Sequence, residues 1–201
     1  KALLFKIFAD IDVFDIEIGT KDIDAFIETV KNIAPTFGGI NLEDIKAPES
    51  FEIERRLVEE LNIPVMHDDQ HGTAIISSAG LLNALELAGK KIEDIKLVVS
   101  GAGSAALACS NLYLLLGVRL ENIIMFDKDG VLHNNRTDLL PIQMKYAKDV
   151  EGMTLGEAMV NSDVFLGLSA PNVLTPEMLL TMNANPIVFA MANPVPEIDY
   201  E

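Results

Sequence analysis

The sequence has a single cysteine, no tryptophan, and only 15 basic residues against 31 acidic ones in a chain of 201 residues. The lone Cys109 excludes a framework of internal disulfides and favours a reducing cytoplasm. No apolar run is long enough to span a bilayer, and the basic-then-apolar pattern of a signal peptide is missing. We therefore expect a cytoplasmic protein that has no membrane partner.

The shortage of basic residues gives the chain a formal net charge of −16 at pH 7. Such a surface repels nucleic acid and anionic lipid, and it makes metal cations plausible ligands. Apolar residues make up 49% of the chain, which excludes a disordered protein and supports a substantial core. The sequence begins at Lys1 without an initiator methionine, so we expect a piece of a longer polypeptide.

Short apolar runs alternate with segments of helical period, which is typical of an α/β protein with a mostly parallel sheet. The opening stretch "KALLFKIFADIDVF" predicts a buried element. Strands are expected at residues 11–16, 38–42, 63–66, 95–100, 121–127, 164–169 and 186–190, and helices at residues 21–33, 49–61, 72–90, 104–117, 154–162 and 175–182. One α/β part gives way to another at residues 68–72, so we predict two domains, residues 1–67 and 68–201.

The stretch "LVVSGAGSAAL" carries the pattern G-x-G-x-x-G/A directly after an expected strand and at the start of an expected helix. The first glycine permits a tight turn, the second lets the backbone approach a pyrophosphate, and the small third residue lets helix and strand pack closely. A tight turn without a ligand is the alternative, but this context favours dinucleotide binding in a Rossmann-like, doubly wound parallel sheet. The predicted cofactor-binding residues are Gly101, Ala102, Gly103, Ser104, Ala105 and Ala106.

Asp127 ends the next expected strand, where an acidic side chain would accept hydrogen bonds from the adenosine ribose. Asp127 alone would repel a 2′-phosphate and so favours NAD. Lys128 and Arg136 are close in sequence and could neutralise that phosphate. The choice between NAD and NADP therefore stays open.

Two acidic pairs, Glu43–Asp44 and Asp68–Asp69, each follow an expected strand. Because the carboxyl ends of parallel strands form the ligand crevice of such sheets, the two pairs could converge there. Three of these carboxylates, with water and substrate oxygens, match the preference of Mg²⁺ or Mn²⁺. Zinc is not expected, because Cys109 is isolated and the three histidines lack ligand spacing.

The same acidic pairs have a second interpretation, as helix caps and solvated loops. The flanking His67 and His71 are expected to be hydrogen-bonding neighbours of the acids and not ligands.

Taken together, these residues resemble the malic enzyme family over essentially the whole chain. The matching stretches are "KALLFKIFADIDVFDIEI", "GINLEDIKAPESFEIE", "IPVMHDDQHGTA", "GAGSAALA", "FLGLSAPNVLTPEM" and "FAMANPVPEI". The chain is most similar to the bacterial malate oxidoreductases, including long forms fused to a phosphotransacetylase-like domain. The resemblance implies oxidation of L-malate with NAD(P)⁺ and decarboxylation to pyruvate and CO₂, with Mg²⁺ or Mn²⁺, by a dimer or larger homo-oligomer.

The resemblance also implies roles for individual residues. It makes Glu43, Asp44 and Asp69 the metal ligands, Lys1 the catalytic base, Asp68 the neighbouring acid that supports Lys1, and Asn193 part of the cofactor and substrate site. Residues 1–67 would then be part of a smaller α/β domain that binds substrate and metal.

The general-acid tyrosine of the family lies upstream of this segment. Tyr113, Tyr146 and Tyr200 do not match its motif. We therefore predict that these 201 residues alone bind cofactor weakly and turn over malate negligibly.

Two other functions fit the sequence. A malolactic enzyme would use the same site but release lactate, without net reduction of NAD(P)⁺. A non-catalytic module that senses dinucleotides would need no divalent ion at Glu43, Asp44 and Asp69, and Asp69→Asn would leave its function intact.

Overall fold

The computed structural model describes residues 1–200, which form two compact units. Unit 1 consists of residues 1–41 and 49–66. Unit 2 consists of residues 42–48 together with the chain from residue 67 onward. The short segment 42–48, placed in the first domain by the sequence analysis, therefore packs with unit 2.

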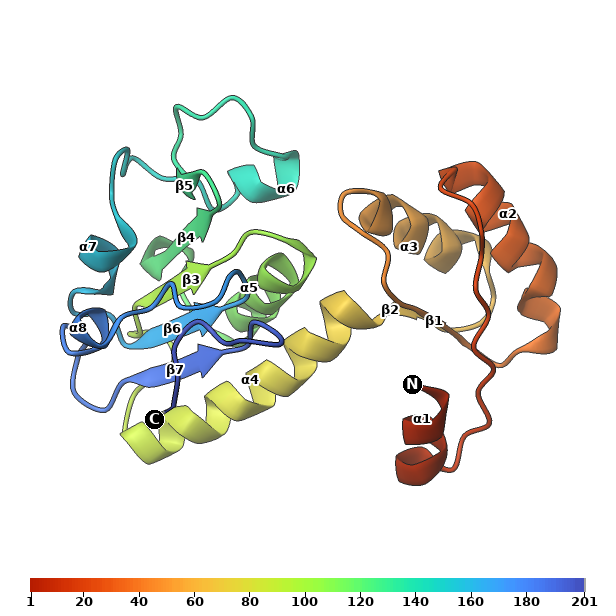
Figure 1. Cartoon of the computed structure of the whole chain (residues 1–201), viewed down its shortest axis with the longest axis horizontal. Helices are drawn as coiled ribbons and strands as arrows, with labels where there is room; N and C mark the ends of the chain where they lie inside the picture. Colours follow the sequence, from red (N-terminus) through yellow and green to blue (C-terminus); the bar gives the residue numbers. More distant parts are fainter. Residues whose placement is uncertain (201) are drawn as a thin grey trace. The chain divides into compact units, whose positions relative to one another are not determined.

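Unit 2 is built on a five-stranded sheet with the strand order β5-β4-β3-β6-β7 (Figure 1). The strands are β3 (Leu97–Ser100), β4 (Ile123–Asp127), β5 (Gly130–Val131), β6 (Val164–Gly167) and β7 (Ile187–Ala190). All neighbouring strands are parallel except β5, which pairs antiparallel with β4 at one edge. The chain leaves β3 for β4 on one side and later crosses to β6 on the other, so the order reverses beside β3. The predicted Rossmann-like, doubly wound sheet is confirmed.

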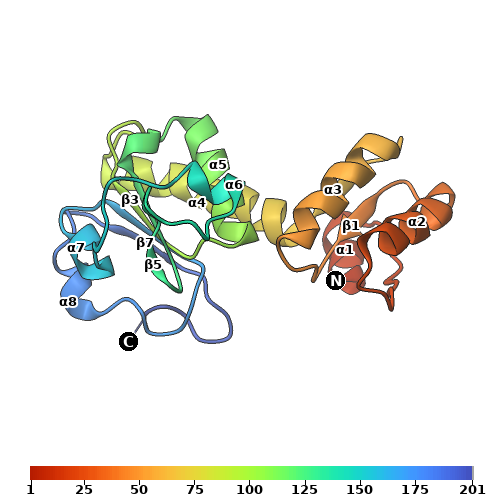
Figure 2. The same cartoon turned by 90° about the horizontal axis from the view of Figure 1, so that it is seen from above.

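Helices cover both faces of this sheet (Figures 1 and 2). The helices of unit 2 are α4 (Asp68–Ala88), α5 (Ser104–Leu116), η2 (Leu120–Asn122), α6 (Pro141–Met144), α7 (Leu155–Met159) and α8 (Pro176–Leu179). Figure 2 shows α4 and α5 on one face and α7 and α8 on the other. Every residue of β3 and β6 is buried, which explains why these strands read as unbroken apolar runs in the sequence.

Helix α4 starts earlier than predicted. In place of the expected acidic turn at residues 68–72, Asp68 and Asp69 form the first helical turn, where the positive end of the helix dipole favours carboxylates. The predicted end is confirmed, because Gly89 caps the helix with a φ of 68°. Among residues 1–200, no helix combines the length and the apolar character needed to cross a membrane.

Unit 1 contains two packed helices and a small sheet. Its elements are α1 (Ala2–Ala9), α2 (Ile23–Ile33), η1 (Ala34–Thr36), α3 (Glu49–Glu60), and the paired strands β1 (Ile40–Leu42) and β2 (Val65–His67), whose last residues belong to unit 2. Helices α2 and α3 each bury an apolar face. Two ion pairs join them, Arg56 with Asp24 and Lys31 with Glu60, each at 2.6 Å.

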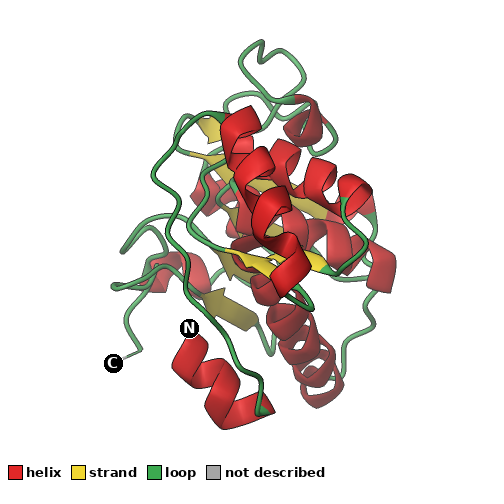
Figure 3. Cartoon of the chain, turned by 90° about the vertical axis from the view of Figure 1, so that its right-hand side faces the viewer, coloured by secondary structure: helices red, strands yellow, loops and turns green. Residues whose placement is uncertain are grey.

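Two predictions for the first residues of the chain are wrong. Residues 1–14 are not buried, because most apolar side chains of α1 are exposed and Phe8 is 83% exposed. The strand expected at residues 11–16 is a loop that follows α1 (Figure 3). A strand needs a neighbour for its backbone hydrogen bonds, and in the described part of unit 1 the sheet consists of β1 and β2 alone.

Candidate metal and dinucleotide site

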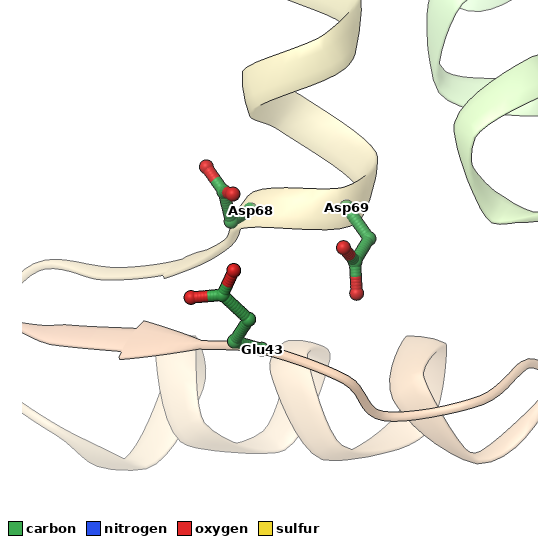
Figure 4. Close-up of side chains that lie close together, drawn as sticks. All are labelled: Glu43, Asp68 and Asp69. Carbon is green, nitrogen blue, oxygen red and sulfur yellow. The ribbon is translucent and has the colours of Figure 1, made fainter. Parts of the chain in front are cut away.

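Three carboxylates of unit 2 come together where α4 begins (Figure 4). Glu43 directly follows β1, and Asp68 and Asp69 occupy the first turn of α4. One carboxylate oxygen from each of the three residues lies within 4.8 Å of the other two. A set of oxygen donors this close together suits a hard divalent cation such as Mg²⁺ or Mn²⁺.

Asp44 meets this group through its backbone. Its N–H donates to Oδ2 of Asp69 at 3.1 Å, and its φ of 57° turns the chain sharply after Glu43. The carboxylate of Asp44 is not among the three that gather. The structure therefore brings together Glu43 and Asp69, two of the predicted ligands, with Asp68 as the third carboxylate. The ligand role of Asp44 and the supporting role of Asp68 stay predictions.

Gly72 makes room for the carboxylate of Asp68. A Cβ atom at position 72 would lie 2.5 Å from Oδ1 of Asp68, so the Asp68 side chain folds back over the next turn of α4. Gly72 was not among the residues expected from the sequence to shape the site, and it lies four residues after Asp68, on the same side of the helix.

The two histidines lie differently. His67 is fully buried immediately before α4, with its Nε2 4.0 Å from Oδ2 of Asp69. His71 is an exposed residue of α4.

The glycine turn follows β3, as predicted. Gly101 has a φ of 120°, and a Cβ atom there would lie 2.4 Å from the carbonyl oxygen of Leu168, so both conformation and space require glycine. A Cβ atom on Gly103 would meet nothing within 4 Å. The packing of the chain itself does not require glycine at position 103, and the approach of a pyrophosphate to Gly103 stays a prediction. Ala106 is 1% exposed, as expected for close packing of α5 on the sheet.

Neighbouring segments hold this turn in place. The N–H of Gly101 donates to the carbonyl oxygen of Phe126 in β4 at 2.8 Å. The side chain of Gln143 in α6 donates to the carbonyl oxygen of Ala102 at 3.0 Å. Ser104 and Ala105 are half-buried in the first turn of α5. Gln143 could not be expected from the sequence, because helix α6 is only four residues long and shows no periodic pattern.

Asp127 ends β4 and pairs with Arg136. The guanidinium donates to both carboxylate oxygens of Asp127 at 2.8 Å, and the backbone N–H of Asp129 donates to Oδ1 at 2.8 Å. Arg136 is 9% exposed and also pairs with Asp138. The carboxylates of Asp127, Asp129 and Asp138 form a second acidic group, and the guanidinium of Arg136 supplies positive charge among them.

These contacts set the pKa values of the group. Burial raises the pKa of Asp127, but the hydrogen bonds from Arg136 and from the N–H of Asp129 lower it, so the net pKa lies below the usual value. The hydrogen bond from Arg136 lowers the pKa of Asp138 to about 2. Asp127 is thus an ionised acceptor at neutral pH, as ribose recognition requires.

Two further predicted site residues, Asn193 and Lys1, are far in sequence from the residues described above. Asn193 is exposed in the loop after β7. Lys1 is exposed immediately before α1 and belongs to unit 1, whereas the other predicted site residues belong to unit 2. The roles of Lys1 and Asn193 stay predictions.

Comparison with known families bears out the resemblance seen in the sequence. The profile described as "Malic enzyme, NAD binding domain" matches residues 70–200, and that described as "Malic enzyme, N-terminal domain" matches residues 19–58.

Among curated relatives, the NADP-dependent malic enzyme of Halomonas elongata is 53% identical over 98% of this chain. The NAD-dependent malic enzyme of Rhizobium meliloti is 55% identical over 98% of this chain. The crystal structure of the NAD-dependent malic enzyme from Thermotoga maritima superposes on 98% of this chain with a TM-score of 0.91 and 46% identity. The chain spans 47% of the Halomonas protein, 26% of the Rhizobium protein and 54% of the Thermotoga chain, so it corresponds to only part of each relative.

Proposed function

The chain belongs to the malic enzyme family, and from that premise we propose that it forms the metal- and dinucleotide-binding part of an enzyme acting on L-malate. This enzyme oxidises L-malate with NAD(P)⁺ and decarboxylates the product to pyruvate and CO₂. One observation carries the proposal. Unit 2 holds both a group of three carboxylate oxygens within 4.8 Å of one another and a glycine turn at the switch point of a doubly wound sheet.

The proposed metal ligands are Glu43, Asp44 and Asp69. Glu43 and Asp69 are supported by the gathered oxygens, and Asp44 is supported by its N–H bond to Asp69, which places its backbone against the group. Bound Mg²⁺ or Mn²⁺ would supply Lewis-acid polarisation of substrate oxygens. The acidic residues would bind and orient that ion.

Lys1 and Asp68 are proposed to handle the proton of the substrate. Lys1 would take the hydroxyl proton of malate as general base, and Asp68 would support the lysine. The fit of Asp68 over Gly72 holds its carboxylate beside Asp69 and Glu43, which favours a supporting role close to the metal.

The dinucleotide is proposed to lie across the carboxyl ends of the strands. Asp127 would accept hydrogen bonds from the adenosine ribose, and the N–H groups at the start of α5 would hold the pyrophosphate. The charges around Asp127 favour NAD over NADP. Asp127, Asp129 and Asp138 outnumber Arg136 and Lys128, and Arg136 is already bonded to two of these carboxylates.

The test is the initial rate of malate oxidation by the full-length protein, measured with NAD⁺ and with NADP⁺, each with Mn²⁺ or with a chelator. We expect a higher kcat/KM with NAD⁺ and loss of activity with the chelator. Asp69→Asn should lower kcat at least about a hundredfold, because it removes a direct metal ligand. Loss of a residue that only hydrogen-bonds to a metal ligand already lowers metal affinity or activity by up to about a hundredfold. Asp94→Asn, an exposed acid remote in sequence, is the matched control.

Other outcomes would redirect the proposal. Malate consumption without accumulation of reduced cofactor would identify a malolactic enzyme. Dinucleotide binding that is indifferent to Asp69→Asn and to the chelator, with no turnover, would identify a sensing module. Mn²⁺ titrations of Asp44→Asn and Asp68→Asn decide which of these two carboxylates binds the metal.

A further inference from the structure

A fully buried carboxylate lies behind the loops that follow β6 and β7. Glu197 is 0% exposed. Its Oε1 accepts a hydrogen bond from the N–H of Ser169 at 2.9 Å, and its Oε2 accepts one from the N–H of Ala192 at 3.0 Å. Ser169 belongs to the loop after β6, and Ala192 belongs to the loop after β7. One side chain therefore joins the two loops.

The surrounding backbone is fitted to this carboxylate. A Cβ atom at Gly167, the last residue of β6, would lie 2.4 Å from Cδ of Glu197, so glycine provides the space. The backbone carbonyl of Glu197 accepts a hydrogen bond from Leu174, and that of Pro196 accepts one from Asn172. Burial of a carboxylate is strongly unfavourable unless its oxygens accept hydrogen bonds. Movement of the loop after β6 would break such bonds to Glu197, so this arrangement holds the loop in one conformation.

Short connections lead from Glu197 to the proposed cofactor site. The hydroxyl oxygen of Ser169 lies 2.7 Å from that of Ser100, the residue directly before Gly101. The hydroxyl of Ser169 also donates to Oε1 of Glu197 at 3.5 Å. On the other side, Ala192 directly precedes Asn193.

The strand order indicates which half of the dinucleotide these loops would meet. Asp127 ends β4, so the adenosine ribose lies on the β4 side of the glycine turn. The strands on the opposite side of β3 are β6 and β7. A dinucleotide that crosses the end of β3 therefore extends its nicotinamide half toward the loops after β6 and β7.

We infer that Glu197 is a positioning residue that fixes these two loops for the nicotinamide half of the cofactor. The inference rests on the dinucleotide binding proposed above. Glu197 acts through the backbone of Ser169 and Ala192. Glu197 was not among the site residues expected from the sequence, because it lies in a proline-rich stretch without periodicity.

The test compares two ligands on the full-length protein by isothermal titration calorimetry. ADP is the probe for the adenosine half, and NAD⁺ or NADP⁺, whichever the wild type binds more tightly, is the probe for the whole dinucleotide. Glu197→Gln replaces one acceptor oxygen by an NH₂ group that faces an N–H donor. It should raise the Kd of the dinucleotide about tenfold, the size expected for a lost hydrogen bond to a charged group. It should change the Kd of ADP by less than about twofold.

Two further variants calibrate this result. Asp127→Asn should raise the Kd of ADP and of the dinucleotide alike, because the adenosine half that Asp127 is proposed to bind is common to both ligands. Glu86→Gln makes the same chemical change at an exposed position of α4 and should leave the Kd of both ligands unchanged.

Equal weakening of both ligands by Glu197→Gln, or no weakening of either, would overturn the inference while leaving the proposed function standing. Wild-type protein that binds neither ligand would overturn the proposed function itself. If Glu197→Gln fails to fold, Glu197→Asp keeps the carboxylate but shortens its reach to the N–H groups of Ser169 and Ala192. It should raise the dinucleotide Kd alone, by about threefold, and an unchanged Kd would overturn the inference.

Discussion

Asp127 and Glu197 are carboxylates on opposite sides of the same glycine turn, and they are stabilised in different ways. Asp127 is 17% exposed and is paired with the guanidinium of Arg136. Glu197 is completely buried and is bonded to the N–H groups of Ser169 and Ala192. The first carboxylate is partly accessible to a ligand, whereas the second is enclosed by the protein.

The contrast shows how one functional group serves two purposes. A carboxylate paired with an arginine at the surface keeps its ionised form and can accept hydrogen bonds from a ribose. A carboxylate bonded to N–H groups from two loops fixes the backbone instead. The binding role of Asp127 and the positioning role of Glu197 follow from these surroundings, and three changes test the contrast.

The largest effect is expected from crowding Glu197. Gly167→Ala would put a Cβ atom 2.4 Å from Cδ of Glu197, so the carboxylate must move from its hydrogen bonds. Overpacking of this kind should lower the free energy of unfolding by about 3 kcal/mol, measured by urea denaturation. Gly38→Ala is the control, because a Cβ atom there would meet nothing within 4 Å. It should change the free energy of unfolding by less than about 0.5 kcal/mol.

The double variant Gly167→Ala/Glu197→Ala checks the cause. Because the shorter side chain removes the clash, the cost of Gly167→Ala should be smaller in the Glu197→Ala background. Equal costs in both backgrounds would show that the carboxylate is not what the methyl group displaces.

A smaller effect is expected at the other carboxylate. Arg136→Ala would remove a guanidinium that is 9% exposed and leave Asp127 and Asp138 without it. We expect a loss of about 2 kcal/mol in the free energy of unfolding, since a partly buried charge loses its partner. Lys128→Ala removes an 86% exposed partner of Asp129 and should leave the free energy of unfolding nearly unchanged. Similar losses in both variants would contradict the importance of the Arg136 pairing.

The smallest effect concerns pH. Arg136 lowers the pKa of Asp138 from 3.8 to about 2. A carboxyl group whose pKa is lower in the folded state stabilises the fold above its unfolded pKa, and this contribution is lost as pH falls through the folded pKa. Stability from Asp138 is therefore present above pH 3.8 and declines toward pH 2. Urea midpoints of Asp138→Asn should fall less steeply with decreasing pH over this range than those of the wild type, and parallel curves would contradict the assignment.

Much of unit 2 could be predicted from the sequence. The buried strands β3 and β6, the glycine turn and the end of α4 at Gly89 are encoded by residues that are neighbours in the chain. Apolar runs, periodicity and glycines at special φ angles act over a few residues, so they can be read without knowing the rest of the fold. Short elements such as α6 and β5 lacked such a pattern and were missed.

The first residues of unit 1 show where local patterns mislead. An apolar stretch predicted a buried element, yet Leu3 and Phe8 are 70% and 83% exposed in α1. An apolar sequence indicates that burial of its side chains would be favourable, but it does not identify the surface against which they would pack.

The α/β class, the parallel sheet with its fingerprint turn and the membership of the chain in its family can be inferred from the sequence alone. The folded arrangement is needed to learn which acidic side chains gather with Glu43, that Arg136 pairs with Asp127, and that Glu197 joins two loops. The two kinds of structure depend on interactions that reach over different distances along the chain. Secondary structure depends on neighbours along the chain, whereas a carboxylate finds its partners among residues that folding brings together from distant positions.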